Sequence, residues 1–466
     1  MGVRHHLIQA SKKADAIPRG PLRYDGARRR QDAILADGQN KCEKQMAEGL
    51  SCSPQALAIG PLAPNDRRRA GAAGCSARRL SPPTDDLASG RRPHLPFECI
   101  ALLLQGGGAL GAYQAGVYEA LTEADLHPDW IAGISIGAIN GALIAGNVPE
   151  ARVGKLRAFW EGITSSSYWD WRELASARCD ATRRWLNQMS AGAAMARGVS
   201  AFFTPRFPVP WLNSPGTVEA TSFYDTSSLR TTLERLVDFD RINAQGMRFS
   251  VGTVNARTGN FVYFDTTTHT IGPQHIMASA ALPPAFPAVE IEGEQYWDGG
   301  LVSNTPLQWV VDNHPHLDTL AFQVDLWNAG GELPRTVAEV ATRQKEIQYS
   351  SRSRAGTNNF KYVQQLRRAM ADLFEKLPED LRNGPEAQLL RPVRDHKVYN
   401  IVHLIYRAKN YEGHSKDYDF SRSSMEDHWR AGYHDALRTL RHPEVLERPT
   451  DHEGVFTFDL PRDGRE

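Results

Sequence analysis

The clearest candidate for chemistry in this sequence is a serine between two glycines, in the stretch GISIG. Gly133, Ser135 and Gly137 fit the G-x-S-x-G pattern of a nucleophile elbow, in which a serine occupies a sharp turn between a strand and a helix. A hydroxyl in such a turn projects from the carboxyl edge of a sheet, beside the positive end of the helix dipole. The pattern therefore predicts acyl transfer through Ser135, and its alternative is a glycine-rich helix start without chemistry.

A second glycine-rich stretch, QGGGALG, precedes this motif. Gly106, Gly108 and Gly111 also satisfy the dinucleotide fingerprint G-x-G-x-x-G. That use needs an acidic residue at the end of the next strand to hold a ribose, but the next strand ends at Ser135. We therefore expect the backbone N–H groups of Gly107 and Gly108 to face a developing oxyanion.

The third candidate is Asp298, in the stretch YWDGGLVSNTPL. Gly299 and Gly300 follow it and permit the backbone to turn sharply. Because Asp-Gly is a common turn dipeptide, this tripeptide alone indicates an ordinary turn. Beside a serine elbow and a glycine loop, it predicts a carboxylate that reaches the same site. Removal of a carboxylate from water raises its pKa toward the range that a general base needs.

The elements around these motifs predict a parallel sheet. An apolar strand comes before the glycine loop, a helix follows at 111–124, a second strand spans 129–134, and a small-residue helix comes next. This is a βαβ unit. Further strands are expected at 247–254, 260–265, 286–297 and 319–327, the last of these closing the main sheet, and helices at 149–162, 226–238 and 273–281. Beyond residue 333 we expect helices at 335–354, 358–376 and 423–440, with one strand at 397–407.

The amino-acid composition indicates which binding partners and which cellular compartment to expect. The 466 residues carry no net charge, which gives no reason to expect nucleic acid binding. Residues 1–95 hold 17 Lys and Arg against 9 Asp and Glu and lack an apolar period, so they are expected to be a disordered basic tail. Five cysteines without a C-x-x-C pair indicate a reducing compartment. We expect a cytoplasmic protein without a signal peptide or transmembrane helix, in peripheral contact with membranes.

The glycine loop, the G-x-S-x-G motif and the D-G-G tripeptide, in this order on a βαβ unit, resemble the patatin-like phospholipases over residues 98–327. The resemblance implies a three-layer α/β/α fold with a mainly parallel sheet, and hydrolysis of lipid esters without a metal or cofactor. It implies that Ser135 is the nucleophile and Asp298 the base of a Ser-Asp dyad. It also implies an oxyanion hole formed by Gly106, Gly107, Gly108 and the backbone N–H of Ile136. The remaining motif glycines, Gly111, Gly133, Gly137, Gly299 and Gly300, would support these turns.

The expected domains are the tail at 1–95, an acyl hydrolase domain at 96–330 and a mainly helical extension at 331–466 packed on that domain. Residues 330–446 resemble an uncharacterised C-terminal extension of some bacterial patatin-like proteins, so this chain is expected to be a bacterial member of the family. An insertion at 159–212 contains five tryptophans, and it is expected either to form an apolar lid or to pack over the sheet. Neither the positional preference for a lipid ester nor the oligomeric state follows from these residues.

Two features leave alternatives open. Plant patatins usually carry a cation before the last glycine of the loop and often begin the loop with Asp, whereas this chain has Leu110 and Gln105. The absent cation favours, as an alternative, a lipid-binding or regulatory module with weak or no catalysis. By order along the chain, His396, His403 or His414 could complete a three-residue triad, although none lies in a recognisable motif.

Overall fold

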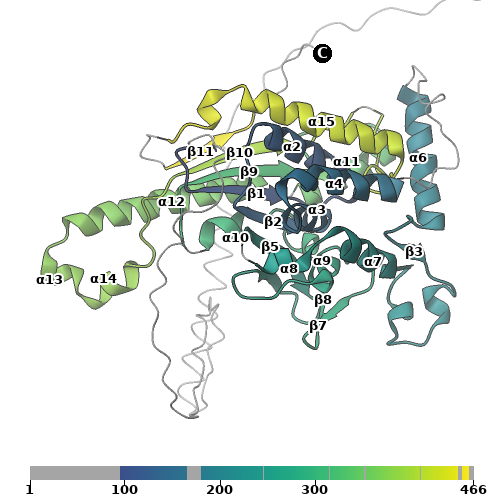
Figure 1. Cartoon of the computed structure of the whole chain (residues 1–466), viewed down its shortest axis with the longest axis horizontal. Helices are drawn as coiled ribbons and strands as arrows, with labels where there is room; N and C mark the ends of the chain where they lie inside the picture. Colours follow the sequence, from purple (N-terminus) through teal and green to yellow (C-terminus); the bar gives the residue numbers. More distant parts are fainter. Residues whose placement is uncertain are drawn as a thin grey trace, which may run out of the picture. The chain divides into compact units, whose positions relative to one another are not determined.

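The computed structural model describes residues 95–164, 180–244, 246–313, 315–350, 353–409, 411–449 and 454–460, all of which belong to one compact unit, Leu87–Glu466 (Figure 1). The predicted disordered tail lies outside the described residues, apart from its last residue, Leu95. Part of the tryptophan-rich insertion, including Trp169 and Trp171, lies outside them as well.

The described strands are β1 (Cys99–Leu104), β2 (Trp130–Ile134), β3 (Thr204–Pro205), β4 (Tyr224–Asp225), β5 (Arg248–Asn255), β6 (Phe261–Asp265), β7 (Val289–Ile291), β8 (Glu294–Asp298), β9 (Thr319–Asp325), β10 (Tyr399–Ile405) and β11 (Val455–Phe458). Apart from the short β3–β4 pair, they form one sheet in the order β11-β10-β9-β1-β2-β5-β8-β7, with β6 also paired to β5 (Figure 1). The pairs from β11 to β5 are parallel, and those of β6, β7 and β8 are antiparallel.

The described helices are α2 (Ala112–Glu123), α3 (Ile136–Ala145), α4 (Pro149–Thr164), α6 (Asp180–Arg197), α7 (Ser227–Leu236), α8 (Phe239–Asn243), α9 (Pro273–Ser279), α10 (Leu307–Asp312), α11 (Val337–Tyr349), α12 (Ser353–Lys376), α13 (Glu379–Arg382), α14 (Pro385–Leu390) and α15 (Arg422–Leu440). Short 3₁₀ turns are η1 (Gly108–Gly111), η2 (Pro210–Leu212), η3 (Val218–Ala220), η4 (Gly299–Leu301) and η5 (Pro443–Val445). In the part of the chain that the structure describes, every helix is too short or too polar to cross a bilayer.

Helices cover both faces of the sheet, because successive side chains of a buried strand point to opposite faces. On β1, Leu102 and Leu104 pack in a core with residues of α2, α3 and α15. Ala101 and Leu103 pack in a second core with α10 and Phe360 of α12. The predicted three-layer α/β/α fold with a mainly parallel sheet and a largely helical C-terminal part is therefore confirmed.

The C-terminal part also extends the sheet, which the sequence analysis did not expect. The expectation that 319–327 closes the main sheet is wrong, because β9 pairs with β1 on one side and β10 on the other. The short strand β11, which was not predicted, pairs with β10 in parallel. Strands β10 and β11 are short, and no turn motif in the sequence indicates which strand each of them pairs with. The expected domain boundary at 330/331 remains a prediction, and the sheet is continuous across it.

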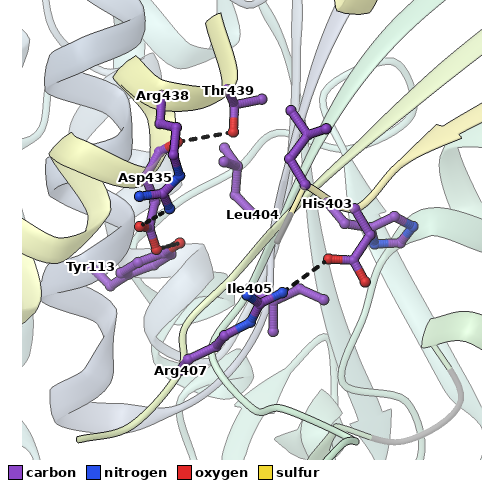
Figure 2. Close-up of a pocket in the computed structure, with 10 residues that line it drawn as sticks. Tyr113, His403, Leu404, Ile405, Arg407, Asp435, Arg438 and Thr439 are labelled. Atoms are coloured by element: carbon purple, nitrogen blue, oxygen red, sulfur yellow. Dashed lines mark hydrogen bonds and ion pairs between the residues drawn. The ribbon is translucent and has the colours of Figure 1, made fainter. Parts of the chain in front are cut away.

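Helix α15 lies along α2, the helix that follows the glycine loop (Figure 1). Tyr113 of α2 donates a hydrogen bond to the Asp435 carboxylate of α15 at 3.0 Å, and Arg438 binds the same carboxylate (Figure 2). Together with His403 and Leu404 of β10, these residues line a hollow of about 10 Å³. A hollow of this volume holds about one water molecule and no larger ligand. We therefore interpret the cluster as a packing contact between α2, α15 and β10.

Candidate active site

Ser135 occupies the turn between β2 and α3. Its φ of 56° and ψ of −124° define a backbone conformation that residues other than glycine rarely adopt. A Cβ atom at Gly137 would lie 2.2 Å from the Leu104 carbonyl oxygen, so glycine there lets α3 approach β1. The buried Ser279 hydroxyl accepts a hydrogen bond from the Ser135 N–H at 2.9 Å and donates to the Gly252 carbonyl at 2.7 Å. The elbow is thus held in place by a serine that the sequence analysis did not single out.

Asp298 is the last residue of β8, and only 2% of its surface is exposed. Burial raises the pKa of its carboxyl group to about 7, and hydrogen bonds from the Ser135 side chain and the Gly300 N–H oppose that rise. The Gly300 bond is 2.7 Å long. The structure therefore brings together Ser135 and Asp298, which lie far apart in the sequence, and it gives the acid a pKa suited to proton transfer near neutral pH.

The glycine loop turns with Gly108 at φ +56°, where glycine is favoured. No described group accepts a hydrogen bond from the N–H of Gly107 or Gly108, and both residues line the same cavity as Ser135. The N–H of Ile136 lies in the first turn of α3, where helix N–H groups have no helical partner. The Gly106 N–H differs, because it donates to the Asn304 side chain at 3.2 Å. Gly106 therefore shapes the loop, and the next two amides are left for a ligand.

Two buried amide side chains hold this loop, and the sequence analysis did not recognise their role. Asn304 also donates to the Gly106 carbonyl at 3.0 Å and to the Tyr349 carbonyl at 3.0 Å. Gln105 accepts from the N–H groups of Leu326 and Trp327 at 2.6 and 3.1 Å. The position where plant patatins often have Asp is thus occupied here by a side chain that ties the loop to the end of β9.

A cavity of about 350 Å³ opens beside the serine. Its lining residues include Gly106, Gly107, Gly108, Ser135, Ile136, Asp298, Gly300 and Asn304 at the polar end. Its apolar wall includes Met195, Phe202, Phe203, Tyr224, Phe286 and Phe420. Several of these rings are in contact, with centroids of Phe203 and Phe286 5.3 Å apart and those of Phe202 and Phe420 6.0 Å apart. The cavity can therefore take an apolar chain whose polar end reaches the serine.

None of the three candidate triad histidines lines this cavity. His403 lies 3.6 Å from Asp325 beside the small hollow of Figure 2, and His396 faces Asp372 and Glu375 on the surface. His414 is exposed. Within the described residues, no group of three or more His, Cys, Asp or Glu side chains is arranged to hold a metal ion.

Comparison with protein families identifies the fold that carries this site. Residues 102–310 match the family model described as patatin-like phospholipase. This part of the chain belongs to the patatin-like phospholipase family. A second family model, described as patatin phospholipase, matches residues 347–452, within the expected C-terminal extension. The patatin-like match includes all the predicted site residues, from Gly106 to Gly300.

The patatin-like relatives share short stretches with this chain. Lysophospholipase nte1 of Aspergillus terreus is 56% identical over 46 residues, 10% of this chain and 3% of that protein. A patatin-like phospholipase domain-containing protein of Coccidioides immitis is 36% identical over 118 residues, 23% of this chain and 16% of that protein. Patatin-like phospholipase domain-containing protein 7 of the mouse is 44% identical over 73 residues, 15% of this chain and 5% of that protein. The chain therefore spans a small share of these relatives' lengths.

These relatives are fungal and animal proteins, so they do not support the expected bacterial origin. Among solved structures, VipD from Legionella pneumophila is similar with a TM-score of 0.33 and 14% identity, over 78% of this chain and 72% of that one. That similarity is too weak to carry a structural argument.

Proposed function

We propose that this protein is a serine acyl hydrolase that cleaves carboxylic esters of lipids. The observation that carries the proposal is that Ser135 and the buried Asp298, whose side chains interact, line the same cavity as the glycine loop and a group of aromatic side chains. A serine hydroxyl is a weak nucleophile until a base accepts its proton. An aspartate with a pKa of about 7 is ionised in a large fraction of molecules at neutral pH and is still basic enough to take that proton.

In the proposed reaction, Ser135 Oγ attacks the ester carbonyl carbon while Asp298 accepts the hydroxyl proton. The carbonyl oxygen becomes an oxyanion, which accepts hydrogen bonds from the N–H groups of Gly107 and Gly108, with that of Ile136 nearby. Collapse of the tetrahedral intermediate breaks the ester bond, and the departing alkoxide takes the proton from Asp298. A water molecule, with Asp298 again as base, then hydrolyses the acyl-enzyme and regenerates Ser135. Residues of the chain thus supply the first nucleophile, the base and the donors to the oxyanion.

The apolar wall indicates the substrate class. Phe202, Phe203, Phe286 and Phe420 line the cavity, and burial of each methylene of an acyl chain against them contributes about 0.8 kcal/mol. A lipid ester places such a chain next to its carbonyl group. Recognition of the acyl chain is therefore expected to dominate substrate binding.

A fluorophosphonate probe tests the proposal, because it reacts covalently with an activated serine. We expect peptide mapping to find the adduct on Ser135, and the Ser135→Ala variant to remain unlabelled. Turnover of a chromogenic medium-chain ester is expected in the same preparation. If the protein binds lipid vesicles but neither labels nor turns over any ester, the hydrolase proposal is wrong and a lipid-binding module is supported.

The chain segment that contributes Met195 to the cavity bears exposed apolar residues, from which we propose contact with a lipid surface. Met195 of α6 lines the cavity and is 54% exposed. In the same segment of the chain, Trp185 is 56%, Trp211 72% and Phe207 97% exposed. Tryptophan and phenylalanine are side chains that insert at the boundary between headgroups and acyl chains. Lipid molecules could then pass from the surface into the cavity along apolar side chains.

The double variant Phe207→Ala/Trp211→Ala is expected to lower partitioning onto phosphatidylcholine vesicles about tenfold or more, because two large apolar side chains no longer insert. Cosedimentation with the vesicles measures this. Leu389→Ala is the control, since Leu389 is 76% exposed but lies on α14. An equal loss in the control, or unchanged partitioning of the double variant, would contradict a docking role for this segment.

A further inference from the structure

One wall of the candidate active site comes from outside the segment that matches the patatin-like model. Lys345 and Tyr349 of α11, and Asp417 in the loop before α15, line the same cavity as Ser135. Lys345 is the one Lys or Arg among the described residues that line this cavity. All three residues follow residue 310, where that family match ends.

Asp417 touches the glycine loop through its main chain. Its carbonyl oxygen accepts a hydrogen bond from the Ala109 N–H at 2.7 Å. A Cβ atom on Gly108 would lie 2.2 Å from this same oxygen, so the loop and the Asp417 backbone are in direct van der Waals contact. The position of Asp417 therefore determines the path of the backbone between Gly107 and Ala109, which carries the two amides left for an oxyanion.

Two crossed ion pairs connect the loop at Asp417 to α11. Lys345 Nζ donates to the Asp417 carboxylate at 2.6 Å, and each of these side chains is 18% exposed. At the adjacent positions, one residue before Asp417 and one after Lys345, Lys416 Nζ donates to the Glu346 carboxylate at 2.6 Å. The ammonium group of Lys345 also lies 5.1 Å from the centre of the Tyr418 ring. Ion pairs that are largely shielded from water hold their partners more firmly than surface pairs.

We propose that the Lys345–Asp417 ion pair is a positioning device that holds the Gly107 and Gly108 amides in the orientation that stabilises the oxyanion. This proposal rests on the proposed hydrolase function and deepens it. It makes α11 and the Asp417 loop a required part of the catalytic apparatus, although they lie outside residues 102–310. Neither residue touches the reacting atoms in this account: Lys345 acts through Asp417, and Asp417 acts through its carbonyl oxygen on the loop.

The kinetic test compares Lys345→Met, Asp417→Asn and Lys345→Arg with Lys397→Met as the matched control. Misplaced oxyanion donors reduce the chemical step and leave substrate binding intact, so Lys345→Met is expected to lower kcat about 10- to 100-fold with KM changed less than about threefold. Lys345→Arg, which keeps the charge, should recover most of the rate. Lys397→Met breaks the ion pair between Lys397 and Glu98, which is also 2.6 Å long but does not involve the cavity, and should retain kcat within about threefold.

The Asp417→Asn variant decides how Lys345 acts. It keeps the carbonyl oxygen that holds Ala109 but removes the charge that Lys345 binds. We expect kcat to fall as in Lys345→Met, and the double variant to fall no further, because both changes break one interaction. If Asp417→Asn keeps the wild-type rate while Lys345→Met loses it, Lys345 acts on the oxyanion directly and the positioning proposal is overturned. An equal loss in Lys397→Met would overturn it as well.

A measurement without substrate separates this proposal from the hydrolase proposal. Amide hydrogen exchange of the peptide that contains Gly107, Gly108 and Ala109 is expected to be about tenfold faster in Lys345→Met than in wild type or Lys397→Met, because the Ala109 hydrogen bond opens more often. This result is expected even if no ester is turned over. Unchanged exchange in Lys345→Met shows that the ion pair does not hold the loop.

Discussion

Replacement of Asp298 by Asn is expected to lower kcat/KM for a medium-chain ester by about 10²- to 10⁴-fold, the range that a general base contributes. The amide has nearly the same shape as the carboxyl group and can still accept a hydrogen bond from Ser135. It cannot accept the hydroxyl proton, so the attacking oxygen stays a neutral alcohol. Initial rates on a chromogenic ester, with Ser135→Ala as the background, measure the loss.

The pH dependence of kcat/KM in the wild-type protein follows from the same role of Asp298. Burial raises the pKa of Asp298 to about 7, and only the ionised carboxylate can act as the base. We therefore expect kcat/KM to decrease as the pH falls below about 7, approaching a tenfold loss for each further pH unit. A rate that stays constant down to about pH 5 would contradict the assignment of Asp298 as the base.

Stability measurements show whether Asp298→Asn is inactive for a chemical reason. The folded protein binds the Asp298 proton more tightly than the unfolded chain does, so the stability that the protonated form contributes is lost as the pH rises through about 7. Asn cannot ionise. The free energy of unfolding of the variant should therefore decrease less than that of wild type between about pH 5 and pH 8. A variant that is at least as stable as wild type at pH 8 has not lost its activity through misfolding.

The sequence predicted the parts of the site that depend on local backbone geometry. The turn at Ser135, the bend at Gly108 and the turn after Asp298 each need particular residues within a few positions, and those residues leave a recognisable pattern. Adjacent parallel strands bring their carboxyl ends together, which explains why the serine turn and the glycine loop were expected side by side. The role of Asp298 was implied by family resemblance, and the structure supplies its contact with Ser135.

The sequence did not predict the residues that support these turns from a distance. Ser279, Asn304 and Asp417 act through single hydrogen bonds to the backbone of the elbow or the loop, and such bonds have no characteristic spacing. Lys345 lies in no motif either, because its neighbours Gln344 and Glu346 are polar residues typical of a solvated helix. The strands β10 and β11 were not assigned to the central sheet for a related reason: parallel pairing brings together segments that lie far apart in the chain.

Helices α2 and α15 are in close contact at two glycines, one on each helix. A Cβ atom on Gly432 would lie 2.0 Å from the Tyr113 carbonyl oxygen, and one on Gly116 would lie 1.9 Å from the Trp429 carbonyl oxygen. Both obstacles are backbone atoms, which cannot move aside as a flexible side chain can. The two helices are therefore as close as they are because neither glycine has a side chain.

Replacement of Gly432 by Ala is expected to lower the free energy of unfolding by about 2–4 kcal/mol, since the helices must separate to admit the methyl group. Separation also stretches the bond from Tyr113 to Asp435. Chemical denaturation monitored by circular dichroism measures the change. Gly154→Ala is the matched control: Gly154 is an exposed residue of α4 with open space around its Cβ position, and alanine there should be neutral or stabilise the protein by up to about 1 kcal/mol.

The same variant tests how the C-terminal part supports the site. Helix α2 begins directly after the glycine loop, so a shift of α2 away from α15 moves the Gly107 and Gly108 amides relative to Ser135. We expect Gly432→Ala to lose more activity than Gly154→Ala at a temperature where both variants are fully folded. If Gly432→Ala is as stable and as active as the control, then the close contact of α2 with α15 contributes neither to folding nor to the placement of the loop.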